Sequence, residues 1–233
     1  MSAVRETTAA GVVLASGAGT RVGAALNKVY LPVAGRRVAA WSLAAFAAVP
    51  GIGVLVLVIR PQDRELAGEV LAAHPGRVEI VPGGPTRQAS ELNALRHLAP
   101  RIEDGTVDAV LLHDAARPLV TPELIGAVLD RTREHGGAVP GLAADDVVSM
   151  AGPDTVGAPL PGAIRVQTPQ GFRARPLLAA YEQAEAEAFL GTDTASCMER
   201  FSALPVRWVP GSAENLKITY PHDLAVTEQL LRR

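Results

Sequence analysis

A glycine-containing segment with two cations follows the first apolar stretch of the chain and is the first candidate for chemistry. Gly17 and Gly19 are followed by Arg21 and, seven residues later, by Lys28. Glycines let the backbone approach a ligand and turn its amides toward negative charge. Phosphate is the natural ligand of such a segment, and the two side chains add full positive charges. A tight turn alone would explain the glycines but not the cations.

The same segment has a second interpretation as a dinucleotide-binding loop. Gly17, Gly19 and Gly23 form the pattern G-x-G-x-x-x-G, one residue longer than the usual one, and Arg60 follows the second strand where an acidic residue is usual. Such an arginine could suit a 2′-phosphate, so an NADP-dependent reductase stays a distant alternative, beside a nucleotide-binding protein without catalysis. A P-loop is excluded, because no G-K-[ST] follows the glycines.

The elements that must position these residues are readable from the apolar pattern. Short apolar runs predict strands over 12–15, 54–59, 78–81, 109–112, 138–139 and 206–209. Helices are expected over 38–49, 63–73, 89–98, 122–134, 175–189, 194–200 and 221–230. Strands without polar alternation are buried on both faces, and their alternation with helices implies parallel strands with crossover helices. The prediction is an α/β fold with a doubly wound, mostly parallel sheet, which binds ligands at the carboxyl ends of its strands.

Residues 141–164 break this pattern and predict a small protruding β-arm. Gly, Pro, Ala and Asp dominate the segment, so only short strands are possible. A segment too thin for a core of its own usually lies against something else, and a partner subunit is one candidate. We therefore expect one domain over 1–233, with the arm as an excursion within it, and a homodimer.

Composition narrows the class of protein. The chain has 233 residues, 48% of them hydrophobic, which is enough for an ordinary core. A net charge of -2 argues against a nucleic-acid binder. Cys197 is the one cysteine, so an intramolecular disulfide or a cysteine-based zinc cluster is excluded. The longest aliphatic run, 54–59, is too short for a bilayer, and no signal peptide is evident, so we expect a cytoplasmic protein without a membrane partner.

Four further polar motifs follow later strands, and with the first segment they carry a specific resemblance. They lie at 83–90 (GGPTRQAS), 113–118 (HDAARP), 167–172 (QTPQGF) and 214–219 (ENLKIT). The set, in order from Gly11 to about Leu230, resembles the 2-C-methyl-D-erythritol 4-phosphate cytidylyltransferases of the non-mevalonate isoprenoid pathway. Ribitol-5-phosphate cytidylyltransferases are close relatives. The resemblance implies a Rossmann-like nucleotidyltransferase fold, transfer of a cytidylyl group from CTP to a polyol phosphate, and Mg²⁺ as cofactor.

The resemblance also implies roles for individual residues. Arg21 and Lys28 match the pair that stabilises the transferring phosphoryl group, and Lys217 matches the lysine that holds the acceptor phosphate. Asp114 matches an aspartate near the ribose and Mg²⁺. The nucleotide-binding set is Ala15, Ser16, Gly17, Gly19, Gly83, Gly84, Arg87, Ser90, Asp114 and Ala115. The acceptor-binding set is Asp146, Arg165, Thr168, Thr192 and Asp193.

Some of these residues also have a purely structural interpretation. Without the resemblance, Ser90 would be assigned to a helix cap or the surface. An ion pair that holds its loop is an even alternative for Arg117, and His113 is interpreted as structural.

The arm departs from the family pattern. Asp146 stands where the family usually has a threonine, Val148 replaces a lysine, and Leu160 lies near the position of an arginine. A phosphate taken out of water needs positive partners. Three explanations stay open: another cation substitutes, the acceptor differs, with ribitol 5-phosphate as one candidate, or activity on the usual acceptor is weak. The cations that could substitute are Arg165, Arg173 and Arg175.

Overall fold

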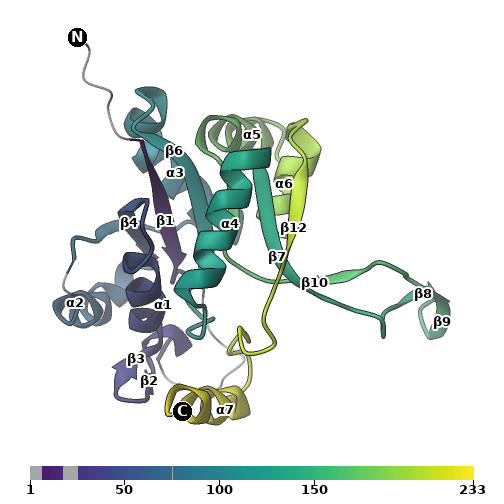
Figure 1. Cartoon of the computed structure of the whole chain (residues 1–233), viewed down its shortest axis with the longest axis horizontal. Coiled ribbons are helices and arrows are strands. Elements are labelled where there is room, and N and C mark those ends of the chain that lie inside the picture. Colours follow the sequence, from purple (N-terminus) through teal and green to yellow (C-terminus); the bar gives the residue numbers. More distant parts are fainter. Residues whose placement is uncertain (1–6, 18–25, 75) are drawn as a thin grey trace.

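A central, mostly parallel sheet organises the chain in the computed structural model, which describes residues 7–17, 26–74 and 76–233 (Figure 1). Within these residues eight strands lie in the order β10-β7-β11-β6-β1-β4-β5, with β12 beside β7. The parallel part consists of β1 (Thr8–Leu14), β4 (Ile52–Ile59), β5 (Glu79–Pro82) and β6 (Val107–Asp114). The remaining strands are β7 (Gly137–Ala143), β10 (Ile164–Val166), β11 (Gln170–Arg173) and β12 (Val206–Pro210). The register sets Leu14 beside Asp114 at the carboxyl end of the sheet.

Helices cover both faces of this sheet, which confirms the doubly wound prediction. One face carries α1 (Val38–Ala47), α2 (Arg64–Ala72) and α4 (Pro122–His135), and the other carries α3 (Arg87–Glu103), α5 (Ala174–Ala186) and α6 (Thr194–Phe201). Neighbouring strand residues alternate between the two cores: Val13 packs with the first group of helices and Val12 with the second. Such two-sided burial explains why the strands lack polar alternation.

Strand β11 and a small hairpin escaped the sequence prediction, and one helix ends later than predicted. Strand β11 lies antiparallel between β6 and β7, although its residues belong to one of the polar motifs and no strand is predicted there. A small hairpin of β2 (Pro32–Val33) and β3 (Arg36–Arg37) precedes α1, and α3 runs five residues beyond its predicted end. The last helix, α7 (Pro221–Leu231), packs on this hairpin in a third small core that includes Val33, Ile218 and Leu224.

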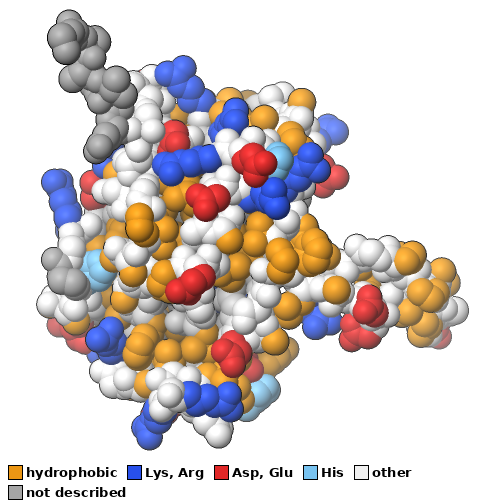
Figure 2. Space-filling model, in the orientation of Figure 1, with side chains coloured by type: hydrophobic (Ala, Val, Ile, Leu, Met, Phe, Trp, Pro, Cys, Tyr) orange, Lys and Arg blue, Asp and Glu red, His pale blue; other side chains and the backbone are white. Residues whose placement is uncertain are grey.

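The predicted arm leaves the body as a thin extension that ends in the hairpin of β8 (Val148–Gly152) and β9 (Thr155–Pro159) (Figure 1). Its side chains include exposed apolar ones, visible in orange in Figure 2. Met150 is 64% exposed and Val156 is 69% exposed. The single-domain division of the chain stays a prediction, as does its cytoplasmic location. Within the described residues, no helix combines the length and apolar character that crossing a membrane requires.

Candidate active site

A cavity of about 680 Å³ opens at the carboxyl ends of β1, β4, β5 and β6, where parallel sheets of this kind bind ligands. Its wall comes from the segments that follow these strands and from one residue near the C-terminus. The lining residues are Leu14, Ser16, Gly17, Asn27, Lys28, Val29, Arg60, Pro61, Gln62, Gly83, Gly84, Pro85, Thr86, Arg87, Ser90, Asp114, Ala116 and Lys217.

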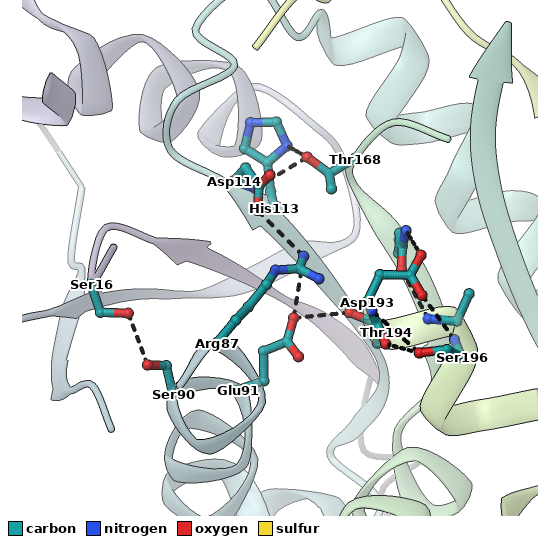
Figure 3. A network of polar contacts seen from close by, with 12 residues as sticks. Ser16, Arg87, Ser90, Glu91, His113, Asp114, Thr168, Asp193, Thr194 and Ser196 are labelled. Atoms are coloured by element: carbon teal, nitrogen blue, oxygen red, sulfur yellow. Dashed lines mark hydrogen bonds and ion pairs between the residues drawn. The ribbon is translucent and has the colours of Figure 1, made fainter. Parts of the chain in front are cut away.

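A serine pair joins the segments after β1 and β5 on one wall of the cavity. The hydroxyl of Ser16 donates to Ser90 Oγ at 2.9 Å, and Ser90 Oγ accepts from the Gly84 amide at 3.1 Å (Figure 3). Gly83 permits this approach, because a Cβ there would lie 2.4 Å from Ser16 Cβ. Ser90 Oγ also lies 2.9 Å from the carbonyl of Thr86, the residue that caps the N-terminus of α3. The wall is therefore built by close backbone packing that only small residues allow.

Asn27 fixes the short helix that presents Lys28 to the cavity. The Asn27 amide donates to the Ala15 carbonyl and to Asp63 Oδ2, each at 3.1 Å. Asp63 is in turn held by Arg60, with Nε–Oδ2 at 2.7 Å and Nη2–Oδ1 at 2.8 Å. Lys28 begins the 3₁₀ helix η2 (Lys28–Tyr30) and is 8% exposed. The lysine is thus held between the end of β1 and the segment after β4.

Asp114, the last residue of β6, sits among cations. Lys217 Nζ lies 2.6 Å from Asp114 Oδ2, and Arg87 Nη2 lies 3.3 Å from Asp114 Oδ1. Burial would raise the pKa of Asp114, but the charges of Arg87 and Lys217 outweigh it and hold the pKa well below its usual range. The carboxylate is therefore ionised and available to a hydroxyl or a metal ion.

His113 and Thr168 support the backbone at Asp114. Thr168 Oγ1 accepts from the Asp114 amide at 3.1 Å and lies 3.0 Å from His113 Nδ1 (Figure 3). His113 is fully buried, and burial lowers its pKa to about 4, so the imidazole is neutral near pH 7. Nε2 then donates to the Arg117 carbonyl at 3.2 Å, and Nδ1 accepts the Thr168 proton. This arrangement agrees with the structural interpretation of His113.

A buried amide network sets the position of Lys217. Asn215 Nδ2 donates to the Thr168 carbonyl at 3.0 Å, and Gln167 Nε2 donates to the Ser212 carbonyl at 2.7 Å. The Arg117 guanidinium donates to the Asn215 carbonyl at 2.7 Å. These bonds join the segment before Lys217 to the loops after β6 and before β11, and so bring a residue from the far end of the chain to the cavity.

Comparison with known proteins identifies the family. The model of the 2-C-methyl-D-erythritol 4-phosphate cytidylyltransferase family matches residues 9–233. The chain belongs to this family.

Individual relatives agree with this membership. A relative from Cereibacter sphaeroides with that family name is 41% identical over 226 residues, covering 96% of this chain and 97% of its own. One from Acidobacterium capsulatum is 37% identical, with 94% and 95% covered. A solved structure of the 4-diphosphocytidyl-2C-methyl-D-erythritol synthase from Anaerococcus prevotii superposes with a TM-score of 0.85 at 27% identity, over 97% of this chain and 99% of that one.

The cavity gathers much of the set that the family resemblance singled out. It is lined by Ser16, Gly17, Lys28, Gly83, Gly84, Arg87, Ser90, Asp114 and Lys217. Ala15 and Ala115 directly follow β1 and β6, and both are buried in the hydrophobic core next to the cavity. Arg21 and Gly19 lie outside the described residues, so their assigned roles stay predictions.

The residues predicted to bind the acceptor are more scattered than the nucleotide-binding set. Thr168 is buried against His113, and Asp193 caps α6 by accepting from the Ser196 amide at 2.9 Å. Thr192 is exposed beside it. Asp146 and Arg165 lie on the arm, with Arg165 Nη2 at 3.5 Å from Asp146 Oδ1. The lining residues of the cavity include none of these five, whose proposed contact with an acceptor is untested.

Two of the substitute cations point elsewhere. Arg173 pairs in register with Ala109, near the amino end of β6, and donates to the Arg133 carbonyl at 3.0 Å. Arg175 donates through Nε to the Ile102 carbonyl at 3.2 Å, at the C-terminal end of α3. Both belong to the end of the sheet opposite Asp114. Arg165 is therefore the remaining candidate of the three.

Sequence reasoning missed several residues around the site. Asn27 acts through contacts with Ala15 and Asp63, 12 and 36 positions away, which no local pattern indicates. Arg60 was considered only as a partner of a 2′-phosphate, whereas the structure pairs it with Asp63, three residues later. Glu91 is a buried carboxylate on α3, one turn after Arg87. The spacing of four residues between the two opposite charges could have indicated this ion pair from the sequence. Among the described residues, no three His, Cys, Asp or Glu side chains gather as a metal cluster.

Proposed function

We propose that this chain transfers the cytidylyl group of CTP to 2-C-methyl-D-erythritol 4-phosphate and releases pyrophosphate. The observation that carries the proposal is the cavity in which Lys28, Arg87, Asp114 and Lys217 converge in a chain that matches the family over residues 9–233. The relatives from Cereibacter sphaeroides and Acidobacterium capsulatum, which are named for methylerythritol phosphate, favour this acceptor over ribitol 5-phosphate. Nothing in the comparisons favours an NADP-dependent reductase.

The reaction joins two anions, so the protein must position them and offset their charge. An oxygen of the acceptor phosphate attacks the α-phosphorus of CTP, the new P–O bond forms, and the bond to the β-phosphate oxygen breaks with pyrophosphate as leaving group. Lys28 is placed to stabilise charge on the transferring group, together with Arg21 in its proposed role. Lys217, drawn toward Asp114, is placed to hold the acceptor phosphate.

The nucleoside is proposed to lie against the serine-paired wall. Gly83 and Gly84 line the cavity on this wall, and the hydroxyl pair of Ser16 and Ser90 beside them offers polar groups at the edge of a base. Asp114 is then within the same cavity to accept from a ribose hydroxyl.

The residues present fit Mg²⁺ as the proposed cofactor. Mg²⁺ typically binds through one or two carboxylates plus substrate phosphates and water, and Asp114 provides one ionised carboxylate in the cavity. When bound, the ion neutralises phosphate charge. Removal of divalent ions with EDTA should abolish pyrophosphate release, and added Mg²⁺ should restore it. Full activity in EDTA would contradict this assignment.

A homodimer is proposed from the arm. Its exposed apolar side chains, Met150 and Val156 among them, are suited to a second copy of the chain, and Arg165 and Asp146 lie on the same segment. In such a dimer the arm would carry Arg165 toward the partner's cavity, which would supply a cation for the acceptor phosphate.

Pyrophosphate release tests the proposed function directly. The chain is incubated with CTP, Mg²⁺ and either methylerythritol phosphate or ribitol 5-phosphate, with Lys28→Met as the inactive control. We expect release with the first acceptor at a rate at least tenfold above the second, roughly the discrimination that one misplaced group provides. Equal rates, or release no faster than in the control, would contradict the proposal.

Labelling of lysine gives an independent readout of occupancy. Lys28 and Lys217 are the two lysines of the sequence, and both line the cavity. An amine-selective reagent should therefore report almost entirely on this site, apart from the terminal amino group. We expect CTP with Mg²⁺ to protect Lys28 and the acceptor phosphate to protect Lys217, each measured by peptide mass spectrometry.

A further inference from the structure

A buried carboxylate that the proposed reaction does not use lies directly behind the cavity. Glu91 is on α3, four residues after Arg87, and is 1% exposed. Burial of an unpaired carboxylate is costly, so its partners explain why it is tolerated. Tyr181 Oη donates to Glu91 Oε2 at 2.6 Å, and Thr194 Oγ1 donates to Oε1 at 2.9 Å.

Arg87 links this carboxylate to the site. Its Nη2 lies 3.3 Å from Glu91 Oε1 and 3.3 Å from Asp114 Oδ1, so one nitrogen is shared by two carboxylates (Figure 3). The two partners differ in their surroundings. Glu91 is held by hydroxyls from α5 and α6, whereas Asp114 faces the cavity, where a ribose hydroxyl or a metal ion would compete for its oxygens.

We infer that Glu91 is a positioning residue that holds Arg87 at Asp114 through the catalytic cycle. The inference rests on the proposed function. When ligands engage Asp114, the attraction between Asp114 and Arg87 weakens, and the Glu91 carboxylate remains as the anchor of the guanidinium. Without that anchor the long arginine side chain regains its rotamer freedom, and Asp114 loses a fixed partner on the nucleotide side.

Glu91→Gln tests this role, because it keeps the size of the side chain and removes its charge. We expect the KM for CTP to rise about tenfold, the lower end of the usual effect of losing a group that orients a ligand-binding residue, with kcat within about twofold. Glu185→Gln is the matched control. Glu185 pairs with Arg96 and so also joins α5 to α3, but on the surface, and its KM for CTP should equal that of the wild type.

A double-mutant cycle with Arg87→Gln separates positioning from a structural role. If Glu91 acts through Arg87, Glu91→Gln should change the KM for CTP less than twofold in the Arg87→Gln background. A tenfold effect in that background, or a wild-type KM for the single Glu91→Gln variant, would overturn the inference. Thermal unfolding is measured for each variant to check that it folds. If Glu91→Gln does not fold, Thr194→Val replaces it, because it removes one hydrogen bond to Glu91 but keeps the charge. We expect the KM for CTP to rise two- to threefold in Thr194→Val. A wild-type KM for Thr194→Val would then overturn the inference.

The Kd of CTP, measured by calorimetry with Mg²⁺ for the same four proteins of the cycle, gives a second readout that does not require turnover. If the wild type binds CTP but releases no pyrophosphate with any acceptor, the proposed function fails while the binding cycle still decides the role of Glu91. Additive effects on the Kd of CTP would contradict the inference, and loss of the Glu91→Gln effect in the Arg87→Gln background would support it.

Discussion

At the scale of single residues, the site is a balance of charges around one aspartate. Asp114 is held ionised by Arg87 and Lys217, and the buried His113 beside it is neutral near pH 7. The cavity thus holds cations that are already paired in the absence of substrate. When the acceptor binds, a phosphate oxygen would take the place of the Asp114 carboxylate at Lys217, so this cation is paired before and after binding.

Lys217→Met should disable the acceptor side of the reaction. The variant keeps most of the side-chain volume but loses the charge that lies 2.6 Å from Asp114. We expect kcat/KM for the acceptor to fall by about 10²–10³, the usual consequence of removing one electrostatic contact to a reacting group. Pyrophosphate release at varied acceptor measures this, with Arg207→Met, an exposed cation on β12, as control. A fall below threefold would refute the assigned role.

Gly83→Ala should impair nucleotide binding without a change in charge. A Cβ at this position would lie 2.4 Å from Ser16 Cβ, so the segments after β1 and β5 must move apart. We expect the KM for CTP to rise about tenfold, because such a shift displaces the serine pair that forms the wall. Steady-state kinetics measures it. Gly126→Ala in α4, where a Cβ meets nothing within 4 Å, is the control and should behave as wild type.

At the scale of elements, α3 connects the site to the rest of the sheet. Its N-terminal turn carries Arg87 and Ser90, and its C-terminal half is tied to β5, where Arg101 bonds Glu79 at 3.0 and 2.6 Å and His97 lies 2.6 Å from the same carboxylate. The helix is thereby fixed along its length, which keeps its cavity-facing turn in register with Gly83 and Gly84.

Glu79→Gln should weaken this attachment in a pH-dependent way. Hydrogen bonds from Arg101 lower the pKa of Glu79 to about 2, against an ordinary value near 4.5. A carboxylate with a lowered pKa stabilises the fold above its ordinary pKa and loses that contribution as the pH falls through the lower value. We expect a loss of about 1–2 kcal/mol in unfolding free energy at pH 7, shrinking between pH 4.5 and 2.

Chemical denaturation of wild type and variant across this pH range measures the difference. Glu185→Gln, at an exposed ion pair, is the comparison and should change the unfolding free energy little at every pH. A difference for Glu79→Gln that stays constant from pH 7 to pH 2 would show that the ion pair is not its origin.

At the scale of the whole molecule, the arm is the part of the chain whose apolar side chains are not covered by the body. The body buries most of its apolar side chains in a core on each face of the sheet and a third small core, whereas the arm exposes Val148, Met150 and Val156. Figure 2 shows this apolar tip projecting from the body into solvent.

Val156→Glu should convert the proposed dimer to a monomer. Val156 is 69% exposed in the single chain, so the substitution should leave the body folded, while a buried charge at an interface between arms would oppose association. Sedimentation at micromolar concentration should give a dimer for the wild type and a monomer for the variant. Leu190→Glu, at an equally exposed leucine of the body, is the control and should remain dimeric. A monomeric wild type would refute the proposed dimer.

The sequence by itself determined the two-sided sheet, because apolar strands such as 54–59 have no polar face to offer water, and it determined the helices, whose caps and apolar spacing are local. It also placed Lys28, Gly83, Ser90 and Asp114 at or after the carboxyl ends of strands, the edge where such sheets bind ligands. Only the tertiary structure decided the antiparallel insertion of β11, the bonds of Asn27 to Ala15 and Asp63, and the contacts of Glu91 with Tyr181 and Thr194. These depend on contacts between residues up to 103 positions apart, which no local pattern of residue types records.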